Sequence, residues 1–154
     1  MDLSKTQPEI PESKDVKVEI LLPYFNDSLG LELLENVSKT LQEHQVPKEN
    51  ITTTRVAGTL ELPFAAQARI KSTTPDVVIA LGVVIKGETS HYDQVCNETY
   101  RGLMDVQLRL DTPIIFGVLT CNTEEQAKKR SSQDGLNKGK SFAEAALIQA
   151  KIKQ

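Results

Sequence analysis

Apolar and polar residues alternate along the chain in blocks that predict strands and helices in turn. Four blocks are rich in β-branched or aliphatic residues and have the length of strands. They span residues 16–22, 51–56, 77–85 and 114–120. The segments that follow them repeat apolar residues every three or four positions, which is typical of helices with one buried face. These helical segments span 27–44, 63–70, 93–110, 122–130 and 142–152.

The predicted order is therefore β-α-β-α-β-α-β-α-α. Such alternation indicates an α/β fold: a three-layer α/β/α sandwich with a four-stranded, mostly parallel sheet of the flavodoxin-like kind. We expect one domain over residues 16–154, preceded by a polar N-terminal tail over residues 1–15. Pro8 and Pro11 disfavour a strand in this tail, because proline lacks the donor that a sheet ladder needs.

Polar residues at the predicted helix starts set the expected boundaries. Asp27 is a suitable N-cap for the first helix, and Pro63 suits the first turn of the second. Asn122 and Glu125 have the spacing of a capping box, which predicts that the fourth helix begins there.

The stretch from Val77 to Glu98 joins a buried strand to a helix through a polar turn. Its apolar run, residues 77–85, predicts a strand buried on both faces. The following turn contains Gly87, and in open α/β sheets such strand–helix turns bind anions, because helix-start amides and the helix dipole favour negative charge. His91 adds a group that can exchange a proton near neutral pH.

Three predicted turns follow strands and should therefore meet at one edge of a parallel sheet. They are Phe25–Asn26, Gly58–Glu61 and Lys86–His91. Together they offer an aromatic face, a carboxylate, an amide-lined anion site and an imidazole. Ligands of open α/β sheets bind at this edge, so the turns predict a pocket for a planar, polar, partly anionic small molecule.

Each of these side chains also has an ordinary structural interpretation. Phe25 could cover the core, and Glu61 could cap the helix that follows it. Lys86 and Glu88 could form a surface ion pair, worth about 0–1 kcal/mol. His91 could cap the long helix. Only their shared placement at strand ends favours a site.

Arg130 and Lys138 flank a glycine-containing loop after the fourth strand. A solvated face is the ordinary interpretation, but Arg130 could bind a phosphate with two parallel hydrogen bonds. Phe116 lies within the fourth predicted strand rather than beyond its end. It could therefore serve a neighbouring subunit's pocket more easily than its own.

Composition narrows the classes of function. The chain has 154 residues, of which 39% are apolar and 25% charged, with a net charge of −3. This charge gives no basic field, so we expect no nucleic-acid partner. No apolar run approaches a membrane span and no signal peptide is visible, so we expect a cytoplasmic protein without membrane contact, or a plastid one if a transit peptide has been removed.

The cysteines give no support to metal or dithiol chemistry. Cys96 and Cys121 are the two in the chain, and no CxxC spacing exists. We expect both to be small apolar side chains in the interior, and we predict no metal site.

The motifs resemble those of lumazine synthase, the enzyme of the penultimate step of riboflavin biosynthesis. The matching segments are Phe25-Asn26, GTLELPFAAQ from Gly58, LGVVIKGETSHYDQVCNE from Leu81, FGVLTCNTEEQAKKR from Phe116, and Asn137-Lys138-Gly139. They follow one another in the family's order and spacing. The resemblance implies condensation of 5-amino-6-(ribitylamino)uracil with 3,4-dihydroxy-2-butanone 4-phosphate to 6,7-dimethyl-8-ribityllumazine, without a cofactor.

The resemblance also implies which residues bind the substrates. In this sequence they are Phe25, Asn26, Thr59, Leu60, Glu61, Val83, Val84, Ile85, Lys86, Glu88, Thr89, Phe116 and Lys138. Phe25 would stack on the pyrimidine ring, residues 59–61 would line the ribityl and ring site, and residues 83–85 would bind the pyrimidine edge through their backbone.

The remaining implied roles concern the phosphate and the chemistry. Glu88 and Thr89 would hold the phosphate with their backbone amides and the Thr89 hydroxyl, helped by Arg130. His91 would transfer protons, so His91 and Arg130 are the predicted catalytic residues. Phe116 would come from an adjacent subunit, which agrees with its position inside a strand.

Three residues depart from the family's usual pattern. Leu60 stands where an aromatic residue is usual, Thr59 where a small one is usual, and Lys86 where arginine is usual. We expect weaker substrate binding rather than lost chemistry. The alternative is a homologue that binds a flavin or ribityl compound with little or no turnover, and a purely structural shell protein is a third interpretation.

A site shared between subunits requires a homo-oligomer. The family forms pentamers, some of which close into icosahedral capsids. The proline-containing tail favours a pentamer here. Riboflavin synthase, the next enzyme of the pathway, is a candidate partner whose association the sequence leaves open.

Overall fold

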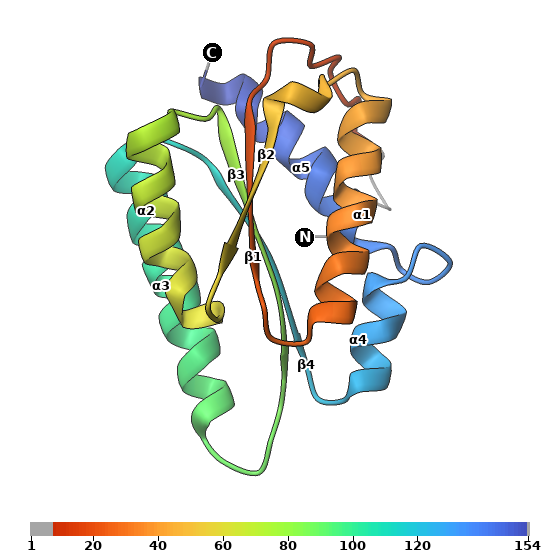
Figure 1. Cartoon of the computed structure of the whole chain (residues 1–154), viewed down its shortest axis with the longest axis vertical. Helices are drawn as coiled ribbons and strands as arrows, with labels where there is room; N and C mark the ends of the chain where they lie inside the picture. The colour runs from red at the N-terminus through yellow and green to blue at the C-terminus, as the bar shows by residue number, and fades with distance from the viewer. Residues whose placement is uncertain (1–7, 154) are drawn as a thin grey trace.

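The computed structural model describes residues 8–153, which form one sheet between two helical layers (Figure 1). The strands are β1 (Val18–Pro23), β2 (Ile51–Val56), β3 (Val77–Ile85) and β4 (Ile114–Cys121). They lie in the order β2-β1-β3-β4, and each pairing between them is parallel. The predicted α/β sandwich of the flavodoxin-like kind is confirmed.

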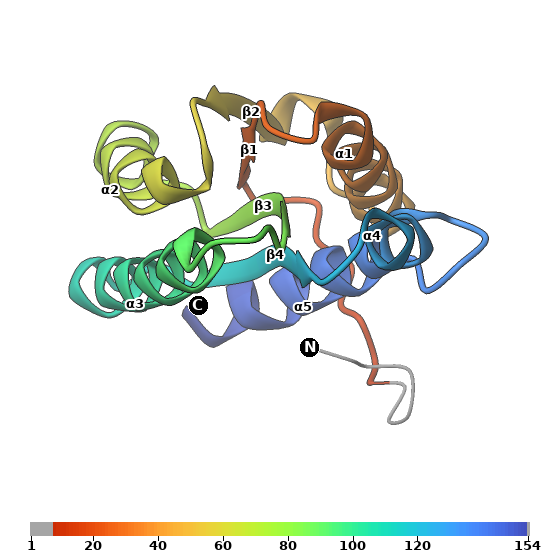
Figure 2. The same ribbon diagram turned by 90° about the horizontal axis from the view of Figure 1, so that it is seen from below.

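Helices cover both faces of the sheet. They are α1 (Asp27–Glu43), α2 (Leu62–Thr73), α3 (His91–Leu110), α4 (Glu124–Ser131) and α5 (Lys138–Lys153), with short 3-10 turns η1 (Lys48–Asn50) and η2 (Thr59–Glu61). Seen along the strands, α2 and α3 lie on one face, and α1, α4 and α5 on the other (Figure 2). Within residues 8–153, no helix is both long and apolar enough to cross a membrane.

Several helix starts differ from the prediction by one to a few residues. Asn26, not Asp27, occupies the N-cap position of α1. The capping box of α4 is shifted by one residue: the Thr123 hydroxyl accepts the Gln126 N–H at 3.2 Å, and the Gln126 side chain accepts the Asn122 N–H at 2.8 Å. Thr123 is therefore the N-cap of α4, and Asn122 is the residue before it.

The third and fifth helices begin earlier than predicted. α3 starts at His91 instead of Asp93, and the Thr89 hydroxyl accepts the His91 N–H at 3.3 Å. α5 starts at Lys138 instead of Phe142, because Asn137 adopts a left-handed conformation and its side-chain oxygen accepts the Lys140 N–H at 3.3 Å. The polar side chains of Thr89 and Asn137 mark these two helix starts, which the spacing of apolar residues alone does not locate.

Residues 1–7 of the predicted tail lie outside the described residues. Residues 8–17 contain neither strand nor helix. Ile10 nevertheless packs on the core beneath α1 and α5, and the Ser13 N–H donates to the His44 carbonyl at 3.0 Å. The described part of this segment is therefore held against the end of α1.

Glu19 is a charged residue in the interior of the sheet. It is 1% exposed, because β1 is a central strand covered on both sides. Its carboxylate accepts hydrogen bonds from Arg69 on α2, at 3.0 Å, and from the Thr54 hydroxyl on β2. This contact joins β1, β2 and α2.

We predict that Glu19→Ala destabilises the fold strongly. It removes the carboxylate and leaves the half-buried Arg69 guanidinium without its partner, so the loss should fall near or somewhat below the roughly 3–5 kcal/mol typical of a broken buried pair. The free energy of urea unfolding, measured at fixed protein concentration, tests this. Glu98→Ala removes the exposed partner of Arg101 and is the matched control. Equal effects of the two changes would contradict the assigned importance of Glu19.

Candidate active site

The turns after β1, β2 and β3 surround a cavity of about 430 Å³ at the carboxyl-terminal edge of the sheet. Its lining residues are Phe25, Asn26, Gly58, Thr59, Leu60, Glu61, Val83, Val84, Ile85, His91 and Val95. Nine of the predicted site residues are among them. Gly58 and Val95 are additional, although Gly58 begins the predicted turn and Val95 lies on the buried face of the predicted helix.

The cavity exists because β3 is longer than its neighbour β1. The β1–β3 register runs only from Val18–Val77 to Leu21–Ala80, whereas β3 stays paired with β4 as far as Ile85–Cys121. Residues 82–85 therefore extend beyond β1, with one backbone edge uncovered. That edge faces the turns that follow β1 and β2.

The uncovered edge of β3 offers hydrogen-bonding groups to the cavity. The Val83 carbonyl accepts the Asn26 side-chain amide at 2.8 Å, and the Lys86 N–H donates to the Cys121 carbonyl of β4 at 2.8 Å. Backbone groups alternate in direction along a parallel strand, so Val83 and Ile85 face the β1 side and Lys86 faces β4. Ile85 thus presents a donor and an acceptor on the side where β1 has ended.

Asn26 holds the β1–α1 turn against this edge. Its backbone is left-handed, with φ 56° and ψ 48°, a conformation that asparagine tolerates better than most residues. Its side chain ties the turn to Val83. The neighbouring Phe25 remains 71% exposed and stands at the cavity rim.

Gly58 lets an aromatic ring and a carboxylate approach one another. A Cβ atom at this position would lie 3.3 Å from Phe25 Cε2 and 2.8 Å from Glu61 Oε2. Its φ of −155° is extended backbone, so glycine is needed here for space rather than for conformation. Phe25 and Glu61 therefore both lie against the space that a side chain at position 58 would fill.

Helix α3 fixes the turn after β2 from below. The Thr99 hydroxyl donates to the Thr59 carbonyl at 3.3 Å, and both residues are buried. Gly102 packs so closely on Pro63 that a Cβ atom there would lie 2.7 Å from the proline ring. Leu60, between these anchors, is 44% exposed and contributes an apolar wall.

The ordinary structural interpretations of the turn residues do not fit this geometry. Phe25 is too exposed to cover the core. Glu61 and His91 make no side-chain cap at the starts of α2 and α3, whose N-cap positions carry no such hydrogen bond. Lys86 and Glu88 form no ion pair with each other or with any described residue. The side chains are left available for a ligand.

The polar turn between β3 and α3 lies beside the cavity without lining it. Lys86, Glu88 and Thr89 are all exposed, between Ile85 and His91, which do line it. The turn leads into the amino terminus of α3, a helix of 20 residues whose dipole favours an anion at this end.

Phe116, Arg130 and Lys138 do not join this cavity. They line a separate hollow of about 190 Å³ beside the edge strand β4. The Phe116 ring stacks on Tyr100 with centroids 5.7 Å apart, and Arg130 donates to the Gln126 carbonyl at 3.2 Å. The predicted site residues are thus divided among the cavity, the polar turn beside it and this separate hollow.

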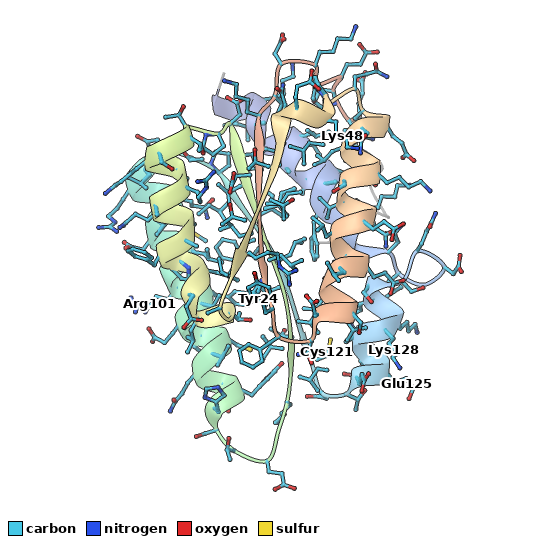
Figure 3. All side chains as sticks on the ribbon, viewed as in Figure 1. Tyr24, Lys48, Arg101, Cys121, Glu125 and Lys128 are labelled. Carbon is cyan, nitrogen blue, oxygen red and sulfur yellow. The ribbon has the colours of Figure 1, made fainter. Side chains whose placement is uncertain are left out.

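The cysteines are poor nucleophiles in this structure. Both are free thiols; Cys121 is buried at the end of β4, as predicted and as labelled in Figure 3, while Cys96 on α3 is only half-buried. Burial raises the pKa of both thiols, so they stay protonated near neutral pH. Among residues 8–153, no group of three or more histidine, cysteine or acidic side chains could hold a metal ion.

Comparison with known families agrees with the motifs and the geometry. Residues 15–154 match the family described as 6,7-dimethyl-8-ribityllumazine synthase. This match covers both hollows, all four strands and every predicted site residue. The resemblance drawn from the motifs is confirmed, and the chain belongs to the 6,7-dimethyl-8-ribityllumazine synthase family, a transferase family of riboflavin biosynthesis.

Proposed function

We propose that this protein condenses 5-amino-6-(ribitylamino)uracil with 3,4-dihydroxy-2-butanone 4-phosphate to form 6,7-dimethyl-8-ribityllumazine. The observation that carries this proposal is the meeting of three turns at one cavity, beside an uncovered backbone edge of β3 and with His91 on its rim. An aromatic ring, a carboxylate, a backbone donor–acceptor pair and an imidazole suit the two substrates and their chemistry.

The cavity offers complementary groups to the pyrimidine substrate. The exposed Phe25 ring gives a stacking surface for a planar heterocycle. The N–H and C=O of Ile85 can pair with an adjacent acceptor and donor on the ring edge. Glu61, held beside Gly58, can accept hydrogen bonds from ribityl hydroxyls, and Leu60 contacts apolar parts of the ligand.

His91 is placed to move protons during the reaction. Schiff-base formation, phosphate elimination and ring closure each require a proton to leave one atom and reach another. An imidazole serves as both acid and base near neutral pH. Binding the two substrates side by side supplies a further part of the rate by proximity. The polar turn at the start of α3 holds the phosphate through the backbone amides of Glu88 and Thr89 and the Thr89 hydroxyl.

The second hollow supports a site completed by a neighbouring subunit. Phe116, Arg130 and Lys138 lie together by the edge strand β4 but apart from the cavity. In a ring of identical subunits, one chain's second hollow can face the next chain's cavity. Arg130 and Lys138 would then bring positive charge to the phosphate from across the interface. This proposal extends the sequence prediction, which assigned only Phe116 to a neighbour.

We expect the assembly in solution to be a pentamer. Light scattering should give a mass about five times the 17.0 kDa of one chain. Pro8 and Pro11 lack the N–H donors that a strand added to a neighbouring subunit's sheet would need, which argues against a capsid held together by such strands. A particle in the megadalton range would show a capsid instead.

We predict that His91→Ala and Arg130→Ala act on different kinetic constants. Lumazine formation from the two substrates is followed by absorbance. His91→Ala should lower kcat by about 10²-fold or more, because it removes an acid–base group. Arg130→Ala should chiefly raise KM for the phosphate substrate, by about tenfold, because it removes a charge-assisted contact.

His44, the other histidine, lies at the end of α1 and makes a matched control. His44→Ala should keep wild-type rates. Unchanged kinetics in both site variants would contradict the assigned roles. A wild-type protein without turnover that binds riboflavin or a lumazine tightly would favour the flavin-binding alternative, and would point to Thr59, Leu60 and Lys86 as the changes responsible.

We predict that Gly58→Ala weakens binding of the pyrimidine substrate selectively. The added methyl group must displace the Phe25 ring or the Glu61 carboxylate, so KM for the pyrimidine should rise by about five- to tenfold. KM for the phosphate substrate should change little. Ala57→Ser adds one atom to the exposed neighbouring residue and is the control. Equal shifts in both KM values would indicate a general disturbance instead.

A further inference from the structure

One arginine outside the cavity contacts nearly the whole β1–α1 turn. Arg55 is the next-to-last residue of β2, and its Nε donates to the Leu22 carbonyl at 3.1 Å. Its Nη2 donates to the Pro23 carbonyl at 3.3 Å and also pairs with the Asp27 carboxylate. Its guanidinium carbon lies 4.2 Å from the centre of the Tyr24 ring.

These contacts bracket the site residues of the turn. Leu22, Pro23 and Tyr24 precede Phe25 in the chain, and Asp27 follows Asn26. On the opposite side, Asn26 is tied to Val83. The backbone that carries Phe25 is therefore held between Arg55 on one side and β3 on the other.

The turn has little apolar packing to hold it in place. Tyr24 and Phe25 are 58% and 71% exposed. Figure 3 shows Tyr24 at the carboxyl-terminal end of the sheet, near the start of α2. A surface turn with two exposed aromatic rings would ordinarily sample several conformations, which would raise the entropic cost of ordering Phe25 on binding.

A guanidinium suits this task better than an ammonium would. Its planar fork binds two successive carbonyls and a carboxylate while one face stacks on an aromatic ring. Lysine could keep the ion pair with Asp27 or the contact with Tyr24, but it lacks the geometry for all of these contacts at once. The charge is also partly shielded from water, because the Arg55 side chain is 25% exposed.

We propose that Arg55 is a positioning residue that presets the β1–α1 turn, and with it the Phe25 ring, for the pyrimidine substrate. Arg55 does not line the cavity and acts only through the turn. The choice of the pyrimidine as the substrate rests on the proposed function. The ordering of the turn by Arg55 is independent of that function.

Steady-state kinetics of Arg55→Ala and Arg55→Lys test the role in binding. We expect KM for the pyrimidine to rise by about tenfold in Arg55→Ala and by less in Arg55→Lys, because lost preorganisation must be regained on binding. kcat and KM for the phosphate substrate should stay within about twofold, a split that general destabilisation would not produce. Arg101→Ala removes another ion-paired arginine, on α3, and should leave all constants unchanged.

Hydrogen exchange tests the ordering without any need for turnover. Amides of residues 24–30 should exchange faster in Arg55→Ala than in the wild type or in Arg101→Ala. Unchanged exchange of these amides in Arg55→Ala would overturn the proposal. If the wild type is active, faster exchange without a rise in KM for the pyrimidine would also overturn it. Faster exchange in a protein whose wild type shows no turnover would uphold the ordering by Arg55 and reject the proposed function.

A milder variant covers the case in which Arg55→Ala does not fold. Asp27→Asn removes only the ion pair and keeps the carbonyl and aromatic contacts. It should give a smaller increase both in exchange of the turn and in KM for the pyrimidine. No increase in either would overturn the proposal.

Discussion

The difference in length between two paired parallel strands creates the candidate site. Because β1 and β3 stay in register only up to Leu21 and Ala80, the last residues of β3 keep one backbone edge without a strand beside it. Buried backbone groups require partners, and here a side-chain amide from Asn26 satisfies one while others face the cavity. Parallel pairing brings the neighbouring turns to the same place, so a single topological feature gathers the aromatic ring, the carboxylate and the imidazole.

Side-chain contacts to the backbone then fix the turns after β1 and β2. Asn26 bonds to Val83, Thr99 bonds to Thr59, and Arg55 bonds to the last carbonyls of β1. In each case the acceptor is a main-chain oxygen in or beside a turn. These contacts therefore use none of the side chains of Phe25, Leu60 and Glu61, which line the cavity. Gly58 contributes in the opposite way, by the absence of a side chain. Two of these ordering residues, Thr99 and Arg55, lie outside the cavity lining, whereas Asn26 and Gly58 belong to it.

The sequence pattern predicts some of these features and misses others for identifiable reasons. The strand 77–85 is found with its true boundaries, because a short apolar run between polar turns has few other interpretations. The burial of Glu19 is not predicted, because the pattern of apolar and polar residues does not reveal that Arg69, 50 positions away, pairs with this carboxylate inside the sheet. The sequence predicts that Phe116 lies away from the main cavity, but it does not predict this for Arg130 and Lys138. Their spacing along the chain does not show on which side of β4 the loop between them lies. The contacts of Arg55 join residues about 30 positions apart and leave no local pattern.

The two hollows also come from separable parts of the sequence. Residues of the cavity fall between positions 25 and 95, and those of the second hollow between 100 and 142. A substitution in the first part can therefore reshape the cavity while the second hollow stays unchanged, and the reverse also holds. Under the proposed function and assembly, selection would have two nearly independent routes for tuning substrate recognition. Mixed oligomers, built from one chain altered in the cavity and one altered in the second hollow, would then separate the two contributions.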